Sequence, residues 1–239
     1  MLDAFRDLVL GSSCVGCTRP GRLLCVSCAD ALDPHPAPAW PTPRPPGLID
    51  PWAATSYDGT VRAMIIGHKE HRLLALATPL GRLLATAVAA AVDDAGPVAP
   101  PADLLLVPVP SRASTVRSRG HDPTTALVRV AAARLSTPAR PARCLPLLRT
   151  RSGLVDQSGL DAGARALNLA GALRVHGPAL RRLARSGRAV QVVVCDDVLT
   201  TGATAAEAQR ALRAVGLPPV AAVAVAATRR RTPSTTVGG

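Results

Sequence analysis

The chain has 239 residues, of which 48% are hydrophobic, so it is long enough for one sizeable α/β domain with an appendage and is not a disordered protein. Aromatic residues make up only 2%, so the core is expected to consist of Ala, Val and Leu, and base stacking has few side chains to use. The net charge of +12 is carried almost entirely by Arg, which favours phosphate esters or nucleic acid as partners, unless the excess reflects the base composition of the coding genome.

The sequence predicts neither export nor membrane insertion. The first seven residues, MLDAFRD, carry acids where a secretory signal has positive charge. The longest apolar stretch, residues 73–92, is interrupted by Thr78-Pro79 and Arg82, which makes it too polar and too short to span a bilayer. We therefore expect a cytoplasmic protein without membrane insertion.

Four of the six cysteines lie near the N-terminus as two Cys-x-x-Cys pairs, Cys14 with Cys17 and Cys25 with Cys28. Two such pairs can turn four thiolates onto one tetrahedral ion, which has no open position and is therefore structural. In a cytoplasmic chain this favours zinc over two disulfides, with vicinal redox pairs or a remnant without zinc as the alternatives. We assign residues 1–33 to a zinc-knuckle module and the proline-rich residues 34–51 to a semi-rigid linker.

From residue 52 onward, strand patterns alternate with helix patterns. Strands are predicted over 52–57, 104–109, 190–195 and 220–227. Helices are predicted from Asp58, from the N-cap Thr78 and the first helical residue Pro79 to about residue 92, over 123–135 after the cap Asp122, and over 204–215. This order indicates a doubly wound, mainly parallel sheet with ligands outside the carboxyl ends of its strands. The domain covers 52–228, and residues 229–239 form a basic flexible tail.

The stretch VVVCDDVLTTGAT, residues 192–204, contains the candidate site. Its strand is expected to end in Asp196 and Asp197, whose charges repel each other unless a cation or a polyhydroxyl ligand uses them. The loop that follows offers backbone N–H groups, hydroxyls and a helix N-terminus to an anion. This combination suits a ribose 5-phosphate, and a purely structural motif is the alternative. The loop residues are Thr200, Thr201, Gly202, Ala203 and Thr204.

The same stretch resembles, at every position, the ribose-phosphate-binding signature of type I phosphoribosyltransferases. The resemblance implies that the loop holds the 5-phosphate of phosphoribosyl pyrophosphate, that the two acids hold the ribose hydroxyls, and that Mg²⁺ accompanies the pyrophosphate. The 6-oxopurine salvage enzymes have a carboxylate where this chain has Thr200. Their base-protonating role is unfilled here, so no catalytic residue is assigned.

Further segments are similar to the ComF competence family in order and spacing. They are LLLVPVPSRASTVRSRGHDPTTAL, LLRTRSGLVDQSGLDAGARALNLAGAL, the cysteine knuckle, and the pattern of Tyr57, Gly59 and Lys69. The family usually has Phe-Asn-Gln where this chain has His121-Asp122-Pro123. The resemblance implies pyrophosphate contacts after the strand at 104–109, with a solvated turn as the alternative, and a mobile flap over residues 149–171. The residues concerned are Arg112, Arg117 and Arg119 in the turn, and Gln157, Arg165 and Asn168 in the flap.

Three functions follow from these patterns. The first is a ComF-like protein of DNA uptake, with protein partners in that process, that binds phosphoribosyl pyrophosphate with Mg²⁺. The second is a phosphoribosyltransferase of nucleotide metabolism, in which an acceptor attacks the anomeric carbon as pyrophosphate leaves. The third is a non-catalytic ribose-phosphate sensor that binds single-stranded DNA weakly through its arginines. No base-recognition element identifies an acceptor.

Overall fold

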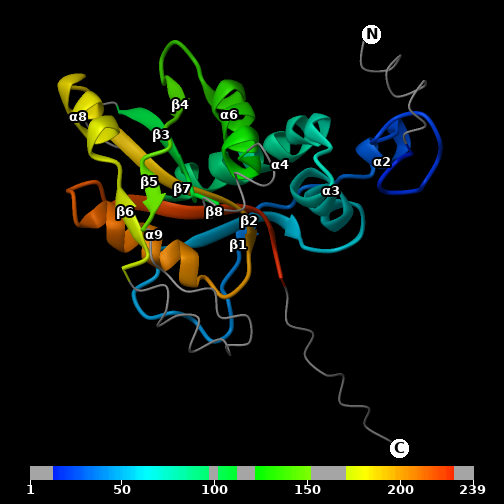
Figure 1. The fold of residues 1–239 in the computed structure, drawn as a ribbon, viewed down its shortest axis with the longest axis horizontal. Coiled ribbons are helices and arrows are strands. Elements are labelled where there is room, and N and C mark those ends of the chain that lie inside the picture. Colours follow the sequence, from blue (N-terminus) through cyan, green and yellow to red (C-terminus); the bar gives the residue numbers. More distant parts are fainter. Residues whose placement is uncertain (1–12, 97–101, 112–121, 152–170, 229–239) are drawn as a thin grey trace, which may run out of the picture.

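The computed structural model describes residues 13–96, 102–111, 122–151 and 171–228, and a six-stranded sheet runs through the middle of the molecule (Figure 1). Five strands are parallel in the order β2-β8-β7-β3-β4, and the short β1 pairs antiparallel with β2 at one edge. The strands are β1 Ala37–Pro38, β2 Pro51–Ser56, β3 Asp103–Pro108, β4 Ala142–Cys144, β7 Val190–Leu199 and β8 Pro219–Ala227. The expected α/β class with a mainly parallel sheet is confirmed.

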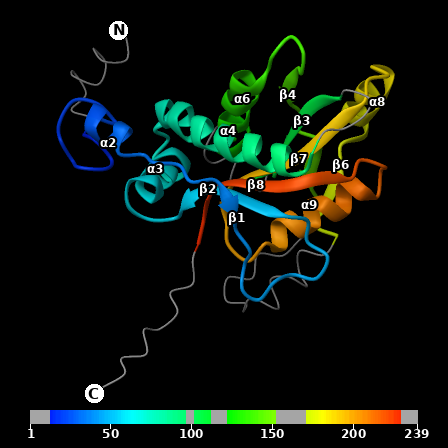
Figure 2. The same ribbon diagram turned by 180° about the vertical axis from the view of Figure 1, so that it is seen from behind.

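Helices cover both faces of this sheet (Figures 1 and 2). One face packs against α3 (Gly59–Glu70), α4 (Ala77–Asp94) and α6 (Pro123–Leu135), and the other against α9 (Ala203–Arg213). Strand β7 contributes to both cores because successive side chains of a strand point to opposite faces. Val193 and Cys195 pack with α3, α4 and α6, whereas Val192 and Val194 pack with α9.

A separate hairpin, β5 (Leu148–Thr150) with β6 (Leu173–Val175), is attached to α9 by hydrogen bonds from a half-buried ion pair of that helix, Glu207 with Arg210. Glu207 accepts a 2.9 Å hydrogen bond from the backbone N–H of Leu173, and Arg210 donates to both Glu207 and the Leu173 carbonyl. Burial raises the pKa of Glu207, but the bonds from Arg210 and from the backbone outweigh it, and the pKa is lowered. The charged carboxylate thus fixes the hairpin before helix α8 (Gly177–Arg185) begins.

Most of the predicted elements are confirmed, with shifted ends. Helix α6 begins at Pro123, and the Asp122 carboxylate caps it by accepting from the Thr125 N–H at 3.1 Å. Helix α4 begins at Ala77 after a 3₁₀ turn over Leu74–Leu76, so the prediction of Thr78 as its N-cap is wrong. The short elements β4, β5, β6 and α8 were not predicted. Three-residue strands are too short to show a period.

The prediction that no segment is apolar enough to span a membrane is wrong for helix α4. Among the described residues, Leu74–Asp94 has the length and composition to cross one, with a mean hydropathy of 1.6. More than half of the apolar window is buried inside the protein, and Gly81 lets α4 approach α6 closely. A Cβ atom at Gly81 would lie 2.5 Å from the Cβ of Val130 and 2.7 Å from the Leu127 carbonyl oxygen. This arrangement is that of a core helix and is compatible with a soluble protein.

The described residues around the four cysteines pack against helices α3 and α4. Around the cysteines, Val15, Leu23, Leu24 and Leu32 pack on the core shared by α3 and α4. A Cβ atom at Gly16 would lie 2.9 Å from both the Cys28 Sγ and the Thr60 Oγ1 of α3. The segment that contains the cysteines is therefore in close contact with α3.

The segment predicted as a linker also makes defined contacts, and we name its residues 35–49 the proline-rich strap. Its strand β1 adds to the sheet, and the Ala39 N–H donates to the Pro51 carbonyl at 2.6 Å. At its other end Leu48 is buried, and the Gln209 side chain bonds to the backbone of Gly47 and Ile49. Both ends of the strap are thus fixed to the main domain.

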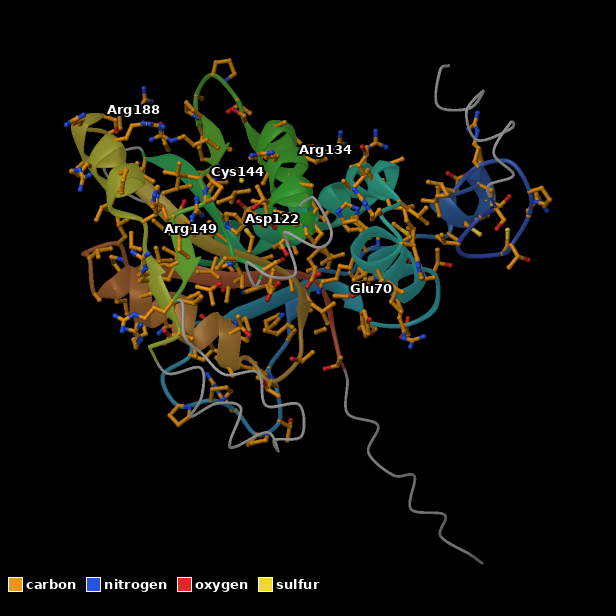
Figure 3. The ribbon with its side chains drawn as sticks, in the orientation of Figure 1. Glu70, Asp122, Arg134, Cys144, Arg149 and Arg188 are labelled. Carbon is orange, nitrogen blue, oxygen red and sulfur yellow. The ribbon has the colours of Figure 1, made fainter. Side chains whose placement is uncertain are left out.

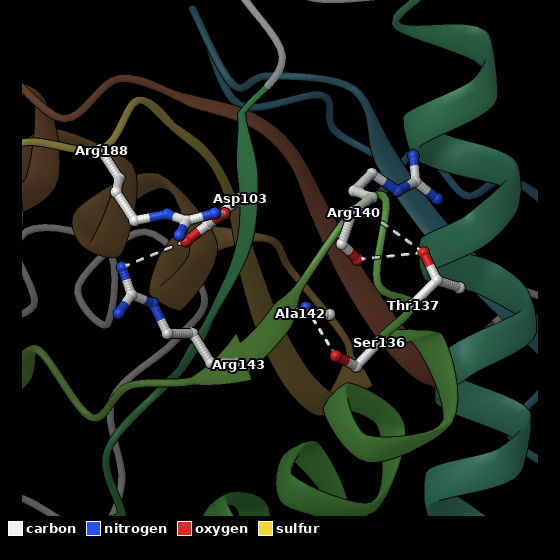
Figure 4. Close-up of polar contacts among 7 residues, drawn as sticks. All are labelled: Asp103, Ser136, Thr137, Arg140, Ala142, Arg143 and Arg188. Carbon is white, nitrogen blue, oxygen red and sulfur yellow. Dashed lines mark hydrogen bonds and ion pairs between the residues drawn. The ribbon is translucent and has the colours of Figure 1, made fainter.

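A polar cluster closes the amino end of the sheet (Figure 4). Asp103, at the start of β3, lies 2.7 Å from Nη2 of Arg188 and 3.7 Å from Nη2 of Arg143. Nearby, Ser136 accepts from the Ala142 N–H at 3.1 Å, which holds the start of β4. Two arginines satisfy one carboxylate here, so this end of the sheet is a structural ion-pair cluster, and the candidate site lies at the opposite end.

Candidate functional site

The strand connections define a topological switch point at the carboxyl end of the sheet. Strand β3 leads through α6 to β4, whereas β7 leads through α9 to β8 in the opposite direction and on the opposite face. In open parallel sheets, ligands bind where neighbouring strands part in this way. The switch point lies between β3 and β7, and both Asp196 and Asp197 belong to β7.

The sequence pattern predicts the two acids at the end of the strand. They lie inside it instead, because β7 continues to Leu199. Adjacent strand residues point to opposite faces, which separates the two carboxylates. Asp197 shares the face of Val193 and Cys195, and Lys69 of α3 reaches it there with Nζ 2.6 Å from Oδ2. Its other oxygen accepts from the Val198 N–H at 2.7 Å.

Asp196 has a different environment. Its Oδ1 accepts a 2.8 Å hydrogen bond from the Asp197 N–H. Burial and the negative charge of Asp197 raise the pKa of Asp196 well above its ordinary value, and the backbone bond and Lys69 offset this only in part. A carboxyl group in this state gains from a ligand that brings positive charge or hydroxyl donors to it.

Gly202 connects the acids to helix α9. It is the N-cap with φ of 73°, a left-handed conformation that glycine adopts without the cost of a Cβ atom. Thr200 and Thr201 beside it are exposed, and Ala203 and Thr204 form the first turn of the helix. Thr201 Oγ1 accepts from the Ala203 N–H at 3.4 Å, a long bond that a stronger acceptor can replace. The N–H groups of a first turn and the helix dipole favour an anion here.

A pocket of about 980 Å³ opens beside this loop. It is lined by the strap, by the ends of β2, β7 and β8, and by one side of α9. Thr200, Thr201 and Ala203 belong to its wall, whereas Asp196 and Asp197 do not. The loop that follows the two acids therefore also forms part of the pocket wall.

The four N-terminal cysteines form a second candidate site, which could hold a structural zinc ion. Their Sγ atoms all lie within 4.8 Å of one another, and Cys17 and Cys25 are 3.6 Å apart. A tetrahedral zinc with bonds of about 2.3 Å separates its sulfurs by about 3.8 Å, so the cluster fits this ion. Backbone N–H groups of Cys25 and Cys28 point to the sulfurs of Cys14 and Cys25.

The protonation of this cluster also favours a cation. Burial raises the pKa of Cys14, but hydrogen bonds from the backbone outweigh it and lower the pKa to about 6. Hydrogen bonds with the Cys25 and Cys17 sulfurs raise the pKa of Cys28 to about 12. Without a metal the cluster therefore holds Cys14 as a thiolate beside the protonated Cys28, and a zinc ion would stabilise all four sulfurs as thiolates.

The structure brings together the predicted residues 196–197 and 200–204, and separately the four cysteines. Lys69 was not predicted as a site residue, and its place in the pattern with Tyr57 and Gly59 was the signal that could have identified it. The other predicted residues lie outside the described part of the chain: Arg112, Arg117, Arg119, Gln157, Arg165 and Asn168.

Neither a family model nor a curated protein matches this chain. What the fold and the sites define is an α/β protein with a mainly parallel six-stranded sheet and an N-terminal four-cysteine cluster suited to zinc.

Proposed function

We propose that the chain is a ComF-like protein of the phosphoribosyltransferase fold that binds phosphoribosyl pyrophosphate with Mg²⁺. One observation carries this proposal: the acids of β7 and the N-terminus of α9 lie within a few residues of each other at the point where the connections from β3 and β7 diverge. A sugar phosphate likewise presents hydroxyls and a phosphate within one small molecule. The sequence resemblance to the ComF family supports an association with DNA uptake.

In this proposal Asp196 and Asp197 accept hydrogen bonds from the ribose hydroxyls, and residues 200–204 hold the 5-phosphate. Lys69 keeps the Asp197 carboxylate in place through their 2.6 Å contact. Mg²⁺ bound to the pyrophosphate supplies positive charge that stabilises it as a leaving group. If transfer occurs, an acceptor nitrogen forms a bond to the anomeric carbon while the bond from that carbon to pyrophosphate breaks.

Calorimetric titration of phosphoribosyl pyrophosphate with Mg²⁺ tests the proposal. Thr201→Glu places a carboxylate against the phosphate, so binding should weaken by roughly 2–4 kcal/mol. Alanine at both Asp196 and Asp197 should weaken ribose recognition but spare binding of inorganic phosphate. Thr137→Glu, in an exposed turn after α6, is the matched control and should bind like the wild type.

The two site variants must differ in pattern. Equal affinities for phosphoribosyl pyrophosphate in the wild type and both variants would show that the motif serves only the fold. Pyrophosphate release measured with a panel of nucleobases then separates a transferase from a sensor, because only the transferase releases it in the presence of an acceptor.

A second candidate function, binding of single-stranded DNA, is favoured by an arginine-rich surface. The described residues 142–151 and 171–189 contain eight arginines and no acid. Arg149 of β5 and Arg174 of β6 are exposed and directly opposite each other, a like-charge pair that a polyanion would relieve. Figure 3 shows Arg149 and Arg188 in this region of the molecule. Arg143 and Arg188 pair with Asp103, and the remaining six are Arg149, Arg151, Arg174, Arg181, Arg182 and Arg185.

Fluorescence anisotropy with an unstructured oligonucleotide between 50 and 200 mM salt tests this candidate. Binding through phosphates should fall steeply with salt, and replacing both Arg149 and Arg174 by Glu should weaken it and reduce the slope. The control is Glu at Arg62 and Arg134, two exposed arginines outside this surface. Equal losses in both double variants would show that only the net charge matters.

A further inference from the structure

The pocket of about 980 Å³ beside α9 has the dimensions of a small-molecule site. Such sites are roughly 300–1,000 Å³ in volume, mostly apolar, with a few polar groups that orient the ligand. The walls follow this composition, since prolines of the strap face alanines of β2, β8 and α9. A ring system with one or two polar substituents matches these walls.

The pocket is preformed because the strap that closes it is held at both ends. Residues 37–39 pair with β2. On the two sides of Leu48, the buried Gln209 side chain donates to the Gly47 carbonyl at 2.8 Å and accepts from the Ile49 N–H at 2.9 Å. The chain between these anchors is stiffened by Pro41, Pro43, Pro45 and Pro46. A wall that is already ordered loses little entropy when a ligand binds.

Among the described residues that line the pocket, one cation is not neutralised by an acid. Arg44 forms no ion pair within the described residues, and its Cζ lies 3.2 Å from the centroid of the Trp40 ring. The other arginine of the lining, Arg210, is already bonded to Glu207 at 2.6 Å. The pocket therefore presents a net positive charge on top of an indole ring.

We propose that this pocket binds a planar aromatic ring carrying a negative charge, stacked on the guanidinium of Arg44. A guanidinium is planar, so with one face on Trp40 its other face remains for a second ring. Its N–H groups, arranged in a fork, are suited to a carboxylate at the rim of that ring. The prolines and alanines of the walls offer apolar contacts to the ring edges.

This inference does not depend on the ribose-phosphate site, because Asp196 and Asp197 are absent from the pocket wall. Within the described part of the chain, the two sites share Thr200, Thr201 and Ala203. Each can therefore be removed by substitutions that leave the other intact.

Titration calorimetry with orotate and with uracil tests the proposal, since these rings differ only by the carboxylate. The wild type should bind orotate about fivefold more tightly than uracil, the ratio given by a partly exposed ion pair of about 1 kcal/mol. Arg44→Gln should remove this preference, and Trp40→Ala should weaken both ligands. Arg134→Gln on α6, on the other face of the sheet (Figure 3), is the matched control and should retain the preference.

Three results would overturn the proposal: no binding of either ring to the wild type, equal affinities for the two rings, or an unchanged preference in Arg44→Gln. Thermal melting shows whether the variants are folded, and Arg44 is exposed, so its replacement should not affect folding. Titration of ribose 5-phosphate into Arg44→Gln separates this proposal from the proposed function. Its affinity should equal that of the wild type, and a loss there would assign Arg44 to the ribose-phosphate site instead.

Discussion

The ion pair between Lys69 and Asp197 gives the sharpest stability prediction. The Asp197 side chain is only 5% exposed, and Lys69 Nζ lies 2.6 Å from it with 32% of its own side chain exposed. Removing one partner of a fully buried pair costs about 3–5 kcal/mol because a charge is left without compensation. Water can reach the Lys69 end, so we expect Lys69→Met to lower the free energy of unfolding by about 2–3 kcal/mol.

A double-mutant cycle in urea tests the cause of this loss. Asp197→Asn removes the charge but keeps an oxygen for the Val198 N–H, and we expect it to cost about 1 kcal/mol. If the loss in Lys69→Met comes from the unpaired carboxylate, the double variant should regain at least about 1 kcal/mol over the sum of the single changes. Arg62→Met, an exposed site on the same helix, should change stability by no more than about 0.5 kcal/mol. Additive effects of the two substitutions would refute the reasoning.

Three further predictions concern protonation, metal and packing. Burial and the charge of Asp197 raise the pKa of Asp196, so the native state binds the proton of the Asp196 carboxyl group more tightly than the unfolded chain does. Stability should therefore fall as pH rises above the ordinary Asp pKa of about 4. Asp196→Asn should reduce that slope in melting curves from pH 4 to 8, and an unchanged slope would contradict this. Metal analysis after purification without chelators should find about one zinc per chain in the wild type and less in Cys25→Ser, and a wild type without zinc would exclude the site. Gly81→Ala should destabilise by about 1–3 kcal/mol in urea because its Cβ would lie 2.5 Å from Val130, and wild-type stability would show that α4 and α6 can separate at little cost.

Local signals along the chain were sufficient for much of the fold. Asp122 followed by Pro123 predicted the start of α6, because a capping carboxylate and a fixed φ act within one turn. The apolar runs predicted β3, β7 and β8, and the spacing of Cys14, Cys17, Cys25 and Cys28 predicted a cluster that the fold does assemble. These features depend on neighbours only a few residues away.

The end of β7 shows where local signals were misleading. Two acids and a hydroxyl loop are typical of a strand end, yet the strand continues to Leu199. Its backbone pairs with β8 as far as Ala227, and Lys69 compensates the charge of the buried Asp197. Strand pairing and an ion pair from another helix outweighed the local preference of the sequence for a turn.

The sequence by itself determined the α/β class, the cysteine cluster and the residues of the acid pair and loop. Only the tertiary structure decided which face each acid occupies, that Lys69 reaches Asp197, and that the strap encloses a pocket with Arg44 over Trp40. The physical reason is the range of the interactions: caps, periodicity and ligand spacing act between near neighbours, whereas these contacts exist only after the chain has packed α3, the strap and α9 around one sheet.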